Sequence, residues 1–516
     1  MPVLRLAIPT PLRTLFDYRP AENMDSDNLR PGQRFRVPFG SREVNGYLVE
    51  LVAESSHGTP ALKPVLEQLD ATPLLPESLM ALCRWAAGYY LHPPGEVLSA
   101  AFPSSLRQGQ PHRPLSNDGW QLTTRGLGLP EGALKRSPRQ AQALALLQQH
   151  GSYSTDQFGA TGIRRAVLRS LQDKGLVEPE DLPAVTRPAQ AHPGPVLTGE
   201  QAAAVAAIRA KQGFRCHLLE GVTGSGKTEI YLQLIARCLE RGEQALLLVP
   251  EIGLTPQTVA RFERRFDADI VVLHSGLTDA QRYRAWEAAR SGLAHIVIGT
   301  RSAVFTPLAR PGLIVVDEEH DGSFKQQDGF RYNARDVAIK RAQLEDCPVL
   351  LGSATPALES LNNALAGRYG HHRLTRRAGG STLPAIRLLD LRRQALTAGF
   401  SEPLQAAIRS TLDRGLQCLL FLNRRGYAPT LQCHDCGWIA SCDHCDARLT
   451  LHRRERRLRC HHCGMVRPSP AECPDCHSEQ LLSLGLGTEQ AEDYLRVTFG
   501  GIPVYRVDSD SMQGRE

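Results

Sequence analysis

The stretch HLLEGVTGSGKTEIYLQLIARCL, residues 217–239, decides the fold because it joins three elements in one short run. Its apolar start predicts a buried strand, its glycine-rich middle predicts a tight turn, and its remainder has the spacing of an amphipathic helix. A strand, a glycine-rich turn and a helix in this order are the setting that a phosphate-binding loop requires. The stretch therefore predicts an α/β domain with a nucleotide site where the helix begins.

Residues 221–228 satisfy the pattern G-x-x-x-x-G-K-T, in which each residue type has a physical role. Lys227 is expected to reach the β- and γ-phosphates, and the hydroxyl of Thr228 to coordinate Mg²⁺. Glycines let backbone N–H groups approach phosphate oxygens, and those of this loop are Gly221, Gly224 and Gly226. We therefore expect ATP to bind here together with Mg²⁺.

A second apolar segment, residues 313–316, runs directly into the acidic sequence Asp317-Glu318-Glu319-His320. At the end of a strand, Asp317 can hold Mg²⁺ through water, and Glu318 can polarise the water that attacks the γ-phosphate. A solvated acidic turn is the alternative interpretation, but it does not explain the apolar run before it. We therefore expect Lys227, Asp317 and Glu318 to carry ATP hydrolysis.

Further polar groups occur in the order that such a site needs. Gln201, in the sequence LTGEQ about twenty residues before the loop, could read adenine through its amide. Polar turns follow three more predicted strands, at Pro250-Glu251, Gly299-Thr300-Arg301 and Gly352-Ser353-Ala354-Thr355. The carboxyl ends of parallel strands meet at one edge of a sheet, where α/β folds bind their ligands.

Eight of the thirteen cysteines form four C-x-x-C pairs downstream of these motifs. Each pair can present two thiolates to one tetrahedral Zn²⁺, so the four pairs predict two Cys₄ zinc sites. A disulfide framework is the alternative, but a chain of 516 residues has a sufficient core without it, and the start of the chain lacks a signal-peptide pattern. The remaining cysteines are expected to be reduced core residues, and they are Cys83, Cys216, Cys238, Cys347 and Cys418.

Spacing predicts which cysteines share a metal. Five residues separate Cys436 from Cys442, whereas fourteen separate Cys445 from Cys460, which is close to zinc-ribbon spacing. We therefore expect one zinc site from the outer pairs, Cys433, Cys436, Cys473 and Cys476. The other zinc site then takes the inner pairs, Cys442, Cys445, Cys460 and Cys463. Nearby histidines are expected not to be ligands, and they are His434, His444, His461, His462 and His477.

Composition excludes some classes of protein and leaves others open. No segment approaches the roughly twenty apolar residues that a membrane span needs, so we expect a cytoplasmic protein of three or four domains. The formal charge is +6, but two Cys₄ zinc sites would lower it to about +2. Net charge therefore does not predict a nucleic-acid partner, and local clusters such as Arg453–Arg459 carry more information.

The motif set resembles a superfamily 2 helicase, and with the cysteine pairs it resembles the PriA family of primosomal replication-restart DNA helicases. The segments that carry the resemblance are PEIGLTPQT, IGTRSAVF, DEEHDGSFKQQDGFRYNARD, LGSATPALES and FLNRRGYAPTLQCHDCGWIA. The resemblance implies an ATP-driven helicase that moves 3′ to 5′, recognises stalled or abandoned forks and helps to reload the replicative helicase. It also implies a monomer that binds forks and single-stranded DNA, primosome proteins and the single-stranded-DNA-binding protein.

The same resemblance implies two sets of DNA-contacting residues. An aromatic-rich loop after the DEEH motif would contact single-stranded DNA and communicate with the ATP site through Phe324, Phe330 and Tyr332. Aromatic rings can stack on bases, although packing in a core is the alternative. An amino-terminal domain would capture the 3′ end of a nascent strand in a pocket formed by Phe16, Asp17, Gly40 and Lys63.

The expected fold is a RecA-like helicase lobe and a partial second lobe with a zinc-ribbon insertion, preceded by a β-rich domain and a winged-helix domain. The winged helix is predicted from a helix opened by Ser137-Pro138 and a second apolar helical face. The expected ranges are 1–105 for the β-rich domain, 106–182 for the winged helix, 183–196 for a linker, 197–375 for lobe 1, 376–432 with 477–516 for lobe 2, and 433–476 for the zinc module.

Two further expectations concern activity. The given sequence has no counterpart of the later second-lobe motifs that the resemblance implies, one of which supplies an arginine to the γ-phosphate. We therefore expect this chain to bind ATP weakly and hydrolyse it poorly, and a non-catalytic fork-binding scaffold is the alternative function. Residues 433–476 hold seven arginines against six carboxylates, so with zinc-bound thiolates the module is negative and suits partner docking better than DNA binding.

Overall fold

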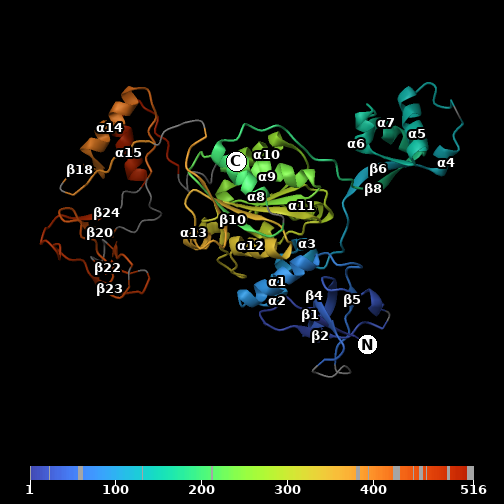
Figure 1. Ribbon diagram of the computed structural model, residues 1–516, viewed down its shortest axis with the longest axis horizontal. Coiled ribbons are helices and arrows are strands. Elements are labelled where there is room, and N and C mark those ends of the chain that lie inside the picture. Colours follow the sequence, from blue (N-terminus) through green and yellow to red (C-terminus); the bar gives the residue numbers. More distant parts are fainter. Residues whose placement is uncertain are drawn as a thin grey trace. The chain divides into compact units, whose positions relative to one another are not determined.

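The computed structural model describes the chain except residues 1, 23, 56–61, 131, 211–212, 379–383, 393, 422–429, 446, 453–456, 461, 485–487 and 508–516. The chain divides into two compact units, Met1–Thr382 and Leu383–Glu516 (Figure 1). Within the described residues, no helix has the length and apolar character needed to cross a membrane.

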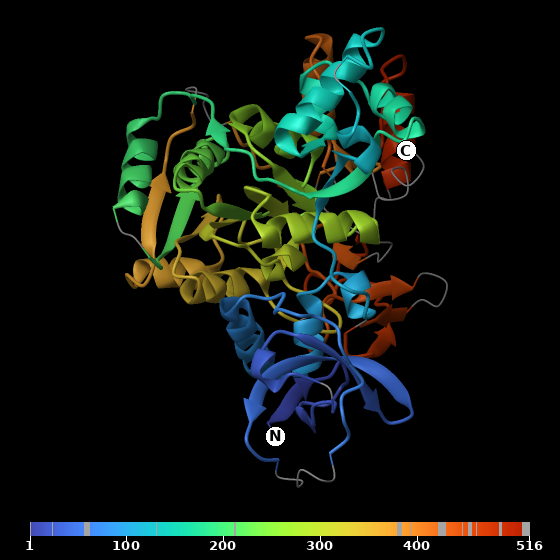
Figure 2. The ribbon, with the colours of Figure 1, turned by 90° about the vertical axis from the view of Figure 1, so that its right-hand side faces the viewer.

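The first unit begins with a five-stranded antiparallel sheet in the order β2-β1-β4-β3-β5 (Figure 2). Its strands are β1 (Val3–Ala7), β2 (Phe16–Tyr18), β3 (Arg34–Phe39), β4 (Arg42–Val52) and β5 (Glu67–Gln68). Three helices follow, α1 (Glu77–Tyr89), α2 (Pro94–Ala100) and α3 (Ser104–Arg107). Alternate strand residues point to opposite faces of the sheet, so one set of apolar side chains forms a core of its own, while Ala7, Tyr47 and Val49 join a second core with α1 and α2. The β-rich start that the sequence predicts is therefore present.

An entirely buried ion pair joins this sheet to the end of α3. The Arg34 guanidinium donates through Nε and Nη2 to the Asp70 carboxylate, at 2.8 and 2.7 Å. It also donates to the backbone carbonyls of Leu106 and Gln110. Because a buried charge is stable only when it is paired and hydrogen-bonded, Arg34 holds these segments in one arrangement.

A separate small module has the predicted winged-helix composition. Its three-stranded sheet has the order β7-β6-β8 and consists of β6 (Ser116–Leu122), β7 (Ser152–Ser154) and β8 (Val177–Pro183). Its helices are α4 (Thr124–Leu127), α5 (Pro138–His150), α6 (Thr155–Ala160) and α7 (Arg165–Asp173). Proline opens α5 at its first position, as predicted, and Ser154 and Gln157 form a capping box on α6. The module has its own core around Trp120, Leu147 and Phe158.

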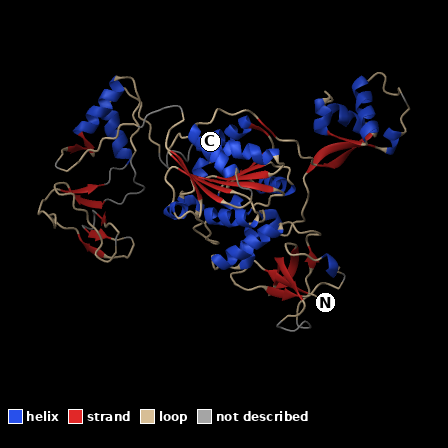
Figure 3. Ribbon diagram, in the orientation of Figure 1, coloured by secondary structure: helices blue, strands red, loops and turns tan. Residues whose placement is uncertain are grey.

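A seven-stranded sheet in the order β13-β14-β11-β15-β16-β10-β17 forms the centre of the first unit, and all its pairings are parallel. Its strands are β10 (Cys216–Gly221), β11 (Gln244–Leu248), β13 (Ile270–Leu273), β14 (Ile296–Gly299), β15 (Pro311–Asp317), β16 (Val349–Ser353) and β17 (Gly370–Leu374). The strands are nearly continuous apolar runs because helices cover both faces of the sheet (Figure 3).

The two faces of this sheet have separate apolar cores. One core contains side chains of α8 (Gly199–Arg209), α9 (Lys227–Glu240) and α10 (Pro256–Arg265). The other contains side chains of α11 (Asp279–Ser291), α12 (Ala334–Leu344) and α13 (Leu358–Leu365), together with α1 and α2. This is the α/β architecture that the strand, turn and helix of residues 217–239 predict.

Within its described residues, the second unit contains two helices, a two-stranded sheet of β18 (Leu396–Thr397) and β19 (Phe400–Ser401), and a zinc-module sheet whose pairings are all antiparallel. The helices α14 (Glu402–Asp413) and α15 (Thr488–Thr498) share a core that includes Ile408 and Phe499. The sheet has the order β23-β22-β21-β20-β24, with β20 (Thr430–Cys433), β21 (Thr450–His452), β22 (Arg457–Arg459), β23 (Val466–Pro468) and β24 (Leu481–Leu484). Because β24 pairs with β20, the sheet extends beyond residues 433–476, the range predicted for the zinc module.

One cysteine departs from its predicted environment. Cys83, Cys216, Cys238 and Cys347 are buried as predicted, whereas Cys418 is exposed. It lies within residues 416–421, which belong to no helix or strand. Leu416 and Leu419 beside it are exposed as well, whereas Leu420 packs against the core shared by α14 and α15.

The buried pair of Arg34 and Asp70 makes a stability prediction. Replacing Asp70 with Ala should lower the free energy of unfolding of the amino-terminal sheet by about 3–5 kcal/mol, because it leaves a buried guanidinium uncompensated. The matched control is Glu67→Ala, which removes the partner of Arg36 at 3.4 Å on the exposed side of the sheet. The control should cost less than about 1 kcal/mol. Native-state hydrogen exchange of the β3 amides measures both, and equal losses would contradict the prediction.

Candidate functional site

The glycine-rich loop joins β10 to α9 in a conformation that only glycines adopt easily. Gly224 and Gly226 have φ of +80° and +83°, in the left-handed region. A Cβ on Gly226 would lie 2.3 Å from Nε2 of Gln201, so no side chain fits at this position. The loop therefore leads directly into the amino end of α9, where free backbone N–H groups favour phosphate.

The predicted catalytic residues lie around this loop. Lys227 Nζ donates to the Gly221 carbonyl at 3.1 Å and lies 3.7 Å from Oε1 of Glu318. A cavity of about 390 Å³ is lined by Thr228, Asp317 and Glu318, among other residues. A hydroxyl and two carboxylates are the hard oxygen ligands that Mg²⁺ prefers, so this set fits a magnesium-bound phosphate. The structure thus brings together the residues that the sequence predicts for hydrolysis.

Asp317 stands at the end of β15 with little access to solvent. Burial raises the pKa of its carboxyl above the usual range, and a hydrogen bond from the Tyr231 hydroxyl opposes that shift. The hydroxyl of Tyr231 donates to Oδ1 of Asp317 at 2.8 Å. Tyr231 lies on α9, one turn beyond the phosphate-loop motif, and the motif pattern gave no signal for it.

The backbone at Glu318 is strained. Its φ is +48°, a region that side-chain-bearing residues occupy rarely and at a cost of about 1–3 kcal/mol. Flanking bonds hold the turn, since the N–H of Glu319 donates to the Gly352 carbonyl at 3.0 Å and that of Asp321 donates to the Glu318 carbonyl at 2.8 Å. The surrounding structure therefore fixes the direction of the Glu318 side chain.

Glu319 is a site residue to which the sequence gave no role. Its side chain is fully buried, and its Oε2 accepts from Arg335 Nη1 at 3.2 Å and from Ser360 Oγ at 2.8 Å. Its Oε1 accepts from the backbone N–H of Ala357 at 2.7 Å. Glu319 therefore links the end of β15 to α12 and to the start of α13. Next to it, Nδ1 of His320 lies 2.7 Å from Oγ of Ser353, which joins the DEEH and GSAT turns.

Gln201 lies beside the loop, but its amide is already engaged. Its Oε1 accepts from the N–H of Thr198 at 2.9 Å in a capping box, and its Nε2 donates to the Ser225 carbonyl at 2.8 Å. The side chain is buried, so in this structure it offers no free amide edge to adenine. This geometry therefore does not favour recognition of adenine by Gln201. Through its hydrogen bond to Ser225, the side chain supports the phosphate loop.

The aromatic-rich loop differs from its predicted environment. Phe324, Phe330 and Tyr332 are only 1%, 8% and 5% exposed. Phe330 packs against Tyr90 and His92 of the amino-terminal region, with ring centroids 5.9 and 5.1 Å apart. These rings therefore offer no exposed platform for stacking, and core packing, the alternative interpretation, describes this conformation. The loop is tied to the strand edge by Arg301, whose Nη1 donates to the Ser323 carbonyl at 2.9 Å.

The four residues predicted to hold a 3′ end lie on or next to the amino-terminal sheet. Phe16 is half-buried on β2 with its ring edge-on to Phe39, and Gly40 follows β3 with φ of +60°. Asp17 accepts from Arg5 Nε at 2.9 Å, and Arg5 also donates to Glu50 at 2.8 Å. Lys63 is exposed. Three of the four residues thus present half-buried or exposed groups, while the Asp17 carboxylate already has a cationic partner.

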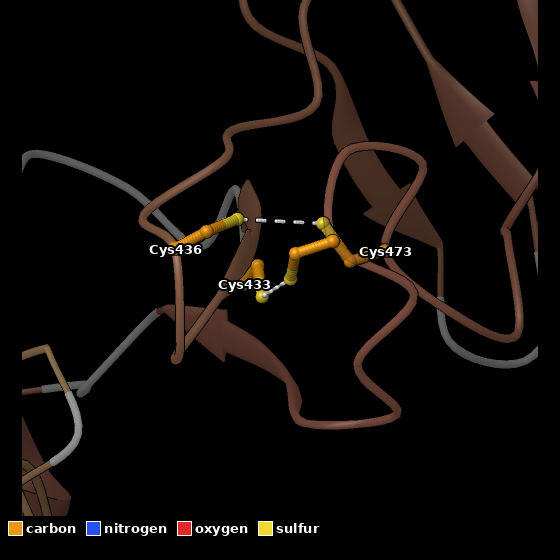
Figure 4. Close-up of side chains that lie close together, drawn as sticks. Cys433, Cys436 and Cys473 are labelled. Atoms are coloured by element: carbon orange, nitrogen blue, oxygen red, sulfur yellow. Dashed lines mark hydrogen bonds between the residues drawn. The ribbon is translucent and has the colours of Figure 1, made fainter.

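The cysteines gather in the two sets of four that their spacing predicts. In the outer set, sulfur atoms of Cys433 and Cys476 lie 3.6 Å apart, and those of Cys436 and Cys473 lie 3.5 Å apart. Figure 4 shows Cys433, Cys436 and Cys473 with their sulfurs turned toward one another. In the inner set, the distance is 3.4 Å for Cys442 and Cys463, and 3.5 Å for Cys445 and Cys460.

These distances fit zinc. A tetrahedral site with Zn–S bonds of about 2.3 Å places its sulfurs about 3.8 Å apart, and in each set every sulfur lies within 4.8 Å of the others. Among the described residues no histidine joins either set, as predicted; His461 lies outside them. The backbone N–H of Cys463 lowers the pKa of the Cys460 thiol to about 6, which favours the thiolate that zinc requires. The predicted basic cluster lies partly outside the described residues, at 453–456.

Comparisons with known proteins match four segments of the chain to family models. They are the 3′DNA-binding domain of PriA at residues 5–103, the winged helix of primosomal protein N′-like proteins at 118–179, the DEAD/DEAH box helicase domain at 198–364, and the Cys-rich region of PriA DNA helicase at 442–468.

Individual relatives align over most of the chain. Replication restart protein PriA of Haemophilus influenzae is 44% identical over 525 residues, which cover 99% of this chain and 70% of that protein. The proteins of the same name from Bacillus subtilis and Treponema pallidum are each 33% identical. Their alignments cover 96% and 99% of this chain, and 71% and 68% of the relatives.

The two cysteine sets make a prediction about metal content. Cys460→Ser should lower the zinc bound per chain from two ions to one, because it removes one thiolate of the inner set only. Cys418→Ser is the matched control, since that cysteine is exposed and belongs to neither set. Metal analysis by mass spectrometry measures both variants. Retention of two ions in Cys460→Ser, or loss of one in the control, would contradict the assignment.

Proposed function

The chain belongs to the PriA family of replication restart proteins. We propose that it unwinds DNA at stalled or abandoned forks in the 3′ to 5′ direction. Like its family it is a DNA helicase and ATPase with a zinc-binding Cys-rich region. The observation that carries the proposal is that Thr228, Asp317 and Glu318 line one cavity next to Lys227. Unwinding and help in reloading the replicative helicase would follow from ATP turnover at that cavity.

The side chains of this cavity divide the work of hydrolysis. Lys227 binds the β- and γ-phosphates, and the backbone N–H groups at the start of α9 hold the phosphate oxygens. Thr228 and Asp317 would hold Mg²⁺, which neutralises charge on the phosphates when it is bound. Glu318 is fixed by its strained backbone and orients the attacking water. The Lys227 ammonium lies 3.7 Å from Glu318, so phosphate binding would release that carboxylate for its role.

We propose two DNA contacts besides the motor. The amino-terminal sheet would receive a nascent 3′ end beside Phe16, Asp17, Gly40 and Lys63, a proposal supported by the match of residues 5–103 to a 3′DNA-binding domain. The loop with Phe324, Phe330 and Tyr332 would contact single-stranded DNA only after some of these rings leave their buried positions. Until then it connects the strand edge at Arg301 with the amino-terminal region.

The zinc module would act as a docking surface for partners. We expect primosome proteins and the single-stranded-DNA-binding protein to be those partners, acting on a monomer in the cytoplasm. The support is electrostatic, because zinc-bound thiolates make residues 433–476 negative overall, and a negative surface repels the DNA backbone. Exposed Arg457 and Arg459 at the edge of β22 would provide a local DNA contact.

The proposed domain organisation follows the predicted ranges with one adjustment. We propose the β-rich domain at 1–105, the winged helix at 106–182, the linker at 183–196, lobe 1 at 197–375 and lobe 2 in the remainder outside the zinc module. The pairing of β20 with β24 supports a zinc module of residues 430–484 rather than 433–476.

Replacement of Lys227 with Ala distinguishes an ATP-driven helicase from a non-catalytic fork-binding scaffold. The variant should lose binding of a fluorescent ATP analogue by at least about tenfold, because a charge-assisted phosphate contact is worth about 1.5–3 kcal/mol. Its affinity for forked DNA should stay within about twofold. The matched control is Arg237→Ala on the exposed side of α9, which should change neither. If neither the wild type nor Lys227→Ala separated strands in the presence of ATP while both bound forked DNA, the scaffold would be the better function.

Asp17 tests the proposed 3′-end pocket. Asp17→Ala should reduce the preference for a fork whose nascent strand ends in a 3′ hydroxyl over one that ends in a 3′ phosphate, because a carboxylate accepts from a hydroxyl and repels a phosphate. Glu50→Ala is the matched control, since Glu50 is the other partner of Arg5. Fluorescence anisotropy measures the ratio of the two affinities. An equal change in both variants would assign the effect to Arg5 rather than to the pocket.

A further inference from the structure

A buried tyrosine touches the ATP site from the interior of the domain. Tyr231 lies on α9 and is 1% exposed, and its hydroxyl donates to Oδ1 of Asp317 at 2.8 Å. The phosphate-loop motif ends at Thr228, so this contact is not part of the pattern that identifies the site. It joins the helix that binds phosphate to the carboxylate expected to hold magnesium.

The backbone of a third element sets the position of the phenol oxygen. A Cβ on Gly352 of β16 would lie 1.7 Å from the Tyr231 hydroxyl oxygen and 2.8 Å from the ring carbon that carries it. Only glycine therefore permits the tyrosine to reach Asp317 at this point. Because β16 is paired on both sides in the sheet, its backbone cannot move away to make room.

The two oxygens of Asp317 have different surroundings. Oδ1 accepts from the Tyr231 hydroxyl and also from the backbone N–H of Glu318 at 3.1 Å. Oδ2 has no hydrogen-bond partner within the part of the chain that the structure describes, and Asp317 lines the cavity shared with Thr228. The carboxylate therefore has one oxygen bound to the protein and one left for a ligand in the cavity.

Among the described residues, no other side chain donates a hydrogen bond to Oδ1 of Asp317. Lys227, the nearest cation of the loop, donates to the Gly221 carbonyl and pairs with Glu318. Without the phenol, Oδ1 would keep one backbone donor, and the carboxylate could rotate so that either oxygen met the cavity. A buried carboxylate is also costly to leave with fewer hydrogen-bond donors.

We propose that Tyr231 is a positioning residue that fixes which oxygen of Asp317 faces the magnesium shell of bound ATP, and thereby sets the affinity of the site for Mg²⁺. This inference rests on the proposed ATP site. Tyr231 is also among the residues that line the cavity, but its hydroxyl donates to Asp317, so it would act on a bound metal through that carboxylate. Gly352 has a part in the same arrangement, because its missing side chain makes the space that the hydroxyl occupies.

The test is Tyr231→Phe, which removes one oxygen and keeps the ring. Binding of a fluorescent ATP analogue is measured in EDTA and then during titration with MgCl₂. Loss of a group that orients a metal ligand typically lowers metal affinity by about 10- to 100-fold, so the Mg²⁺ concentration for half-maximal response should rise about tenfold or more. Affinity for the analogue in EDTA should stay within about twofold. The matched control, Tyr47→Phe, removes a buried hydroxyl of the amino-terminal sheet and should change neither value.

Three outcomes would overturn the proposal. In the first, Tyr231→Phe needs the same Mg²⁺ concentration for half-maximal response as the wild type. In the second, its affinity for the analogue in EDTA falls by the same factor by which its Mg²⁺ requirement rises, which would indicate a general distortion of the site. A wild type with no Mg²⁺-dependent binding would instead overturn the proposed ATP site along with the inference. The first two outcomes leave the ATP site intact, so the two failures are distinguishable.

A double-mutant cycle provides a second measurement. Gly352→Ala should also raise the Mg²⁺ requirement about tenfold, because its methyl group displaces the hydroxyl from Asp317. Once Phe occupies position 231, adding Gly352→Ala should raise the requirement by clearly less than tenfold, since the bond is already absent and only the 2.8 Å approach of the new Cβ to the ring carbon remains. Full multiplication of the two single effects would overturn the link between Gly352, Tyr231 and Asp317.

Discussion

The parallel pairing of β16 with both β15 and β10 is the constraint on which the ATP site depends. Gly352 lies opposite Asp317 in one ladder and opposite Leu219 in the other, which brings the ends of all three strands to one edge. Residues about a hundred positions apart in the sequence then meet around a single phosphate loop. Parallel ladders allow no slip of one residue here, because a slip would turn every buried side chain to the opposite face. The chemistry of the site is therefore a consequence of strand register.

Buried polar groups at this edge are stable because each has its partners. Glu319 accepts three hydrogen bonds from α12, α13 and the turn before α13, and Asp317 accepts two. An unpaired carboxylate at such depth would cost several kcal/mol, so the network permits few alternative arrangements. Backbone bonds of Glu319 and Asp321, together with the bond from the Glu318 N–H to Asp317, hold Glu318 at a positive φ, which an isolated chain would avoid. The hydrogen bonds that stabilise this edge of the sheet therefore also hold Asp317 and Glu318 in position for catalysis.

The sequence could predict the parts of the site that local pattern determines. Lys227 and Thr228 lie in a short motif, and the cysteine pairing follows from loop lengths of five and fourteen residues. Tyr231, Glu319 and the pair of Arg34 with Asp70 could not be predicted, because each depends on contacts between segments far apart in the chain. The environment of Gln201 could not be predicted for a related reason: its motif is recognisable, but the hydrogen bond to Ser225 that engages its amide exists only in the folded loop.

The buried aromatic loop can be reconciled with DNA binding by comparing two energies. Exposing one aromatic ring of this size costs about 1.5–3 kcal/mol, and stacking a base on it returns about 1–3 kcal/mol. For each ring these terms nearly cancel, and releasing Phe324, Phe330 and Tyr332 together would multiply any small remaining cost threefold. Phe330 is the most exposed of the three and packs against Tyr90 and His92, outside the loop itself. We therefore expect DNA binding to expose the Phe330 ring before the other two. Its exposure would break the contact between the loop and the amino-terminal region. Arg301 binds Ser323 at one end of this loop, and Arg335, just beyond its other end, binds Glu319 next to Glu318. Movement of the loop would therefore change the surroundings of the ATP site.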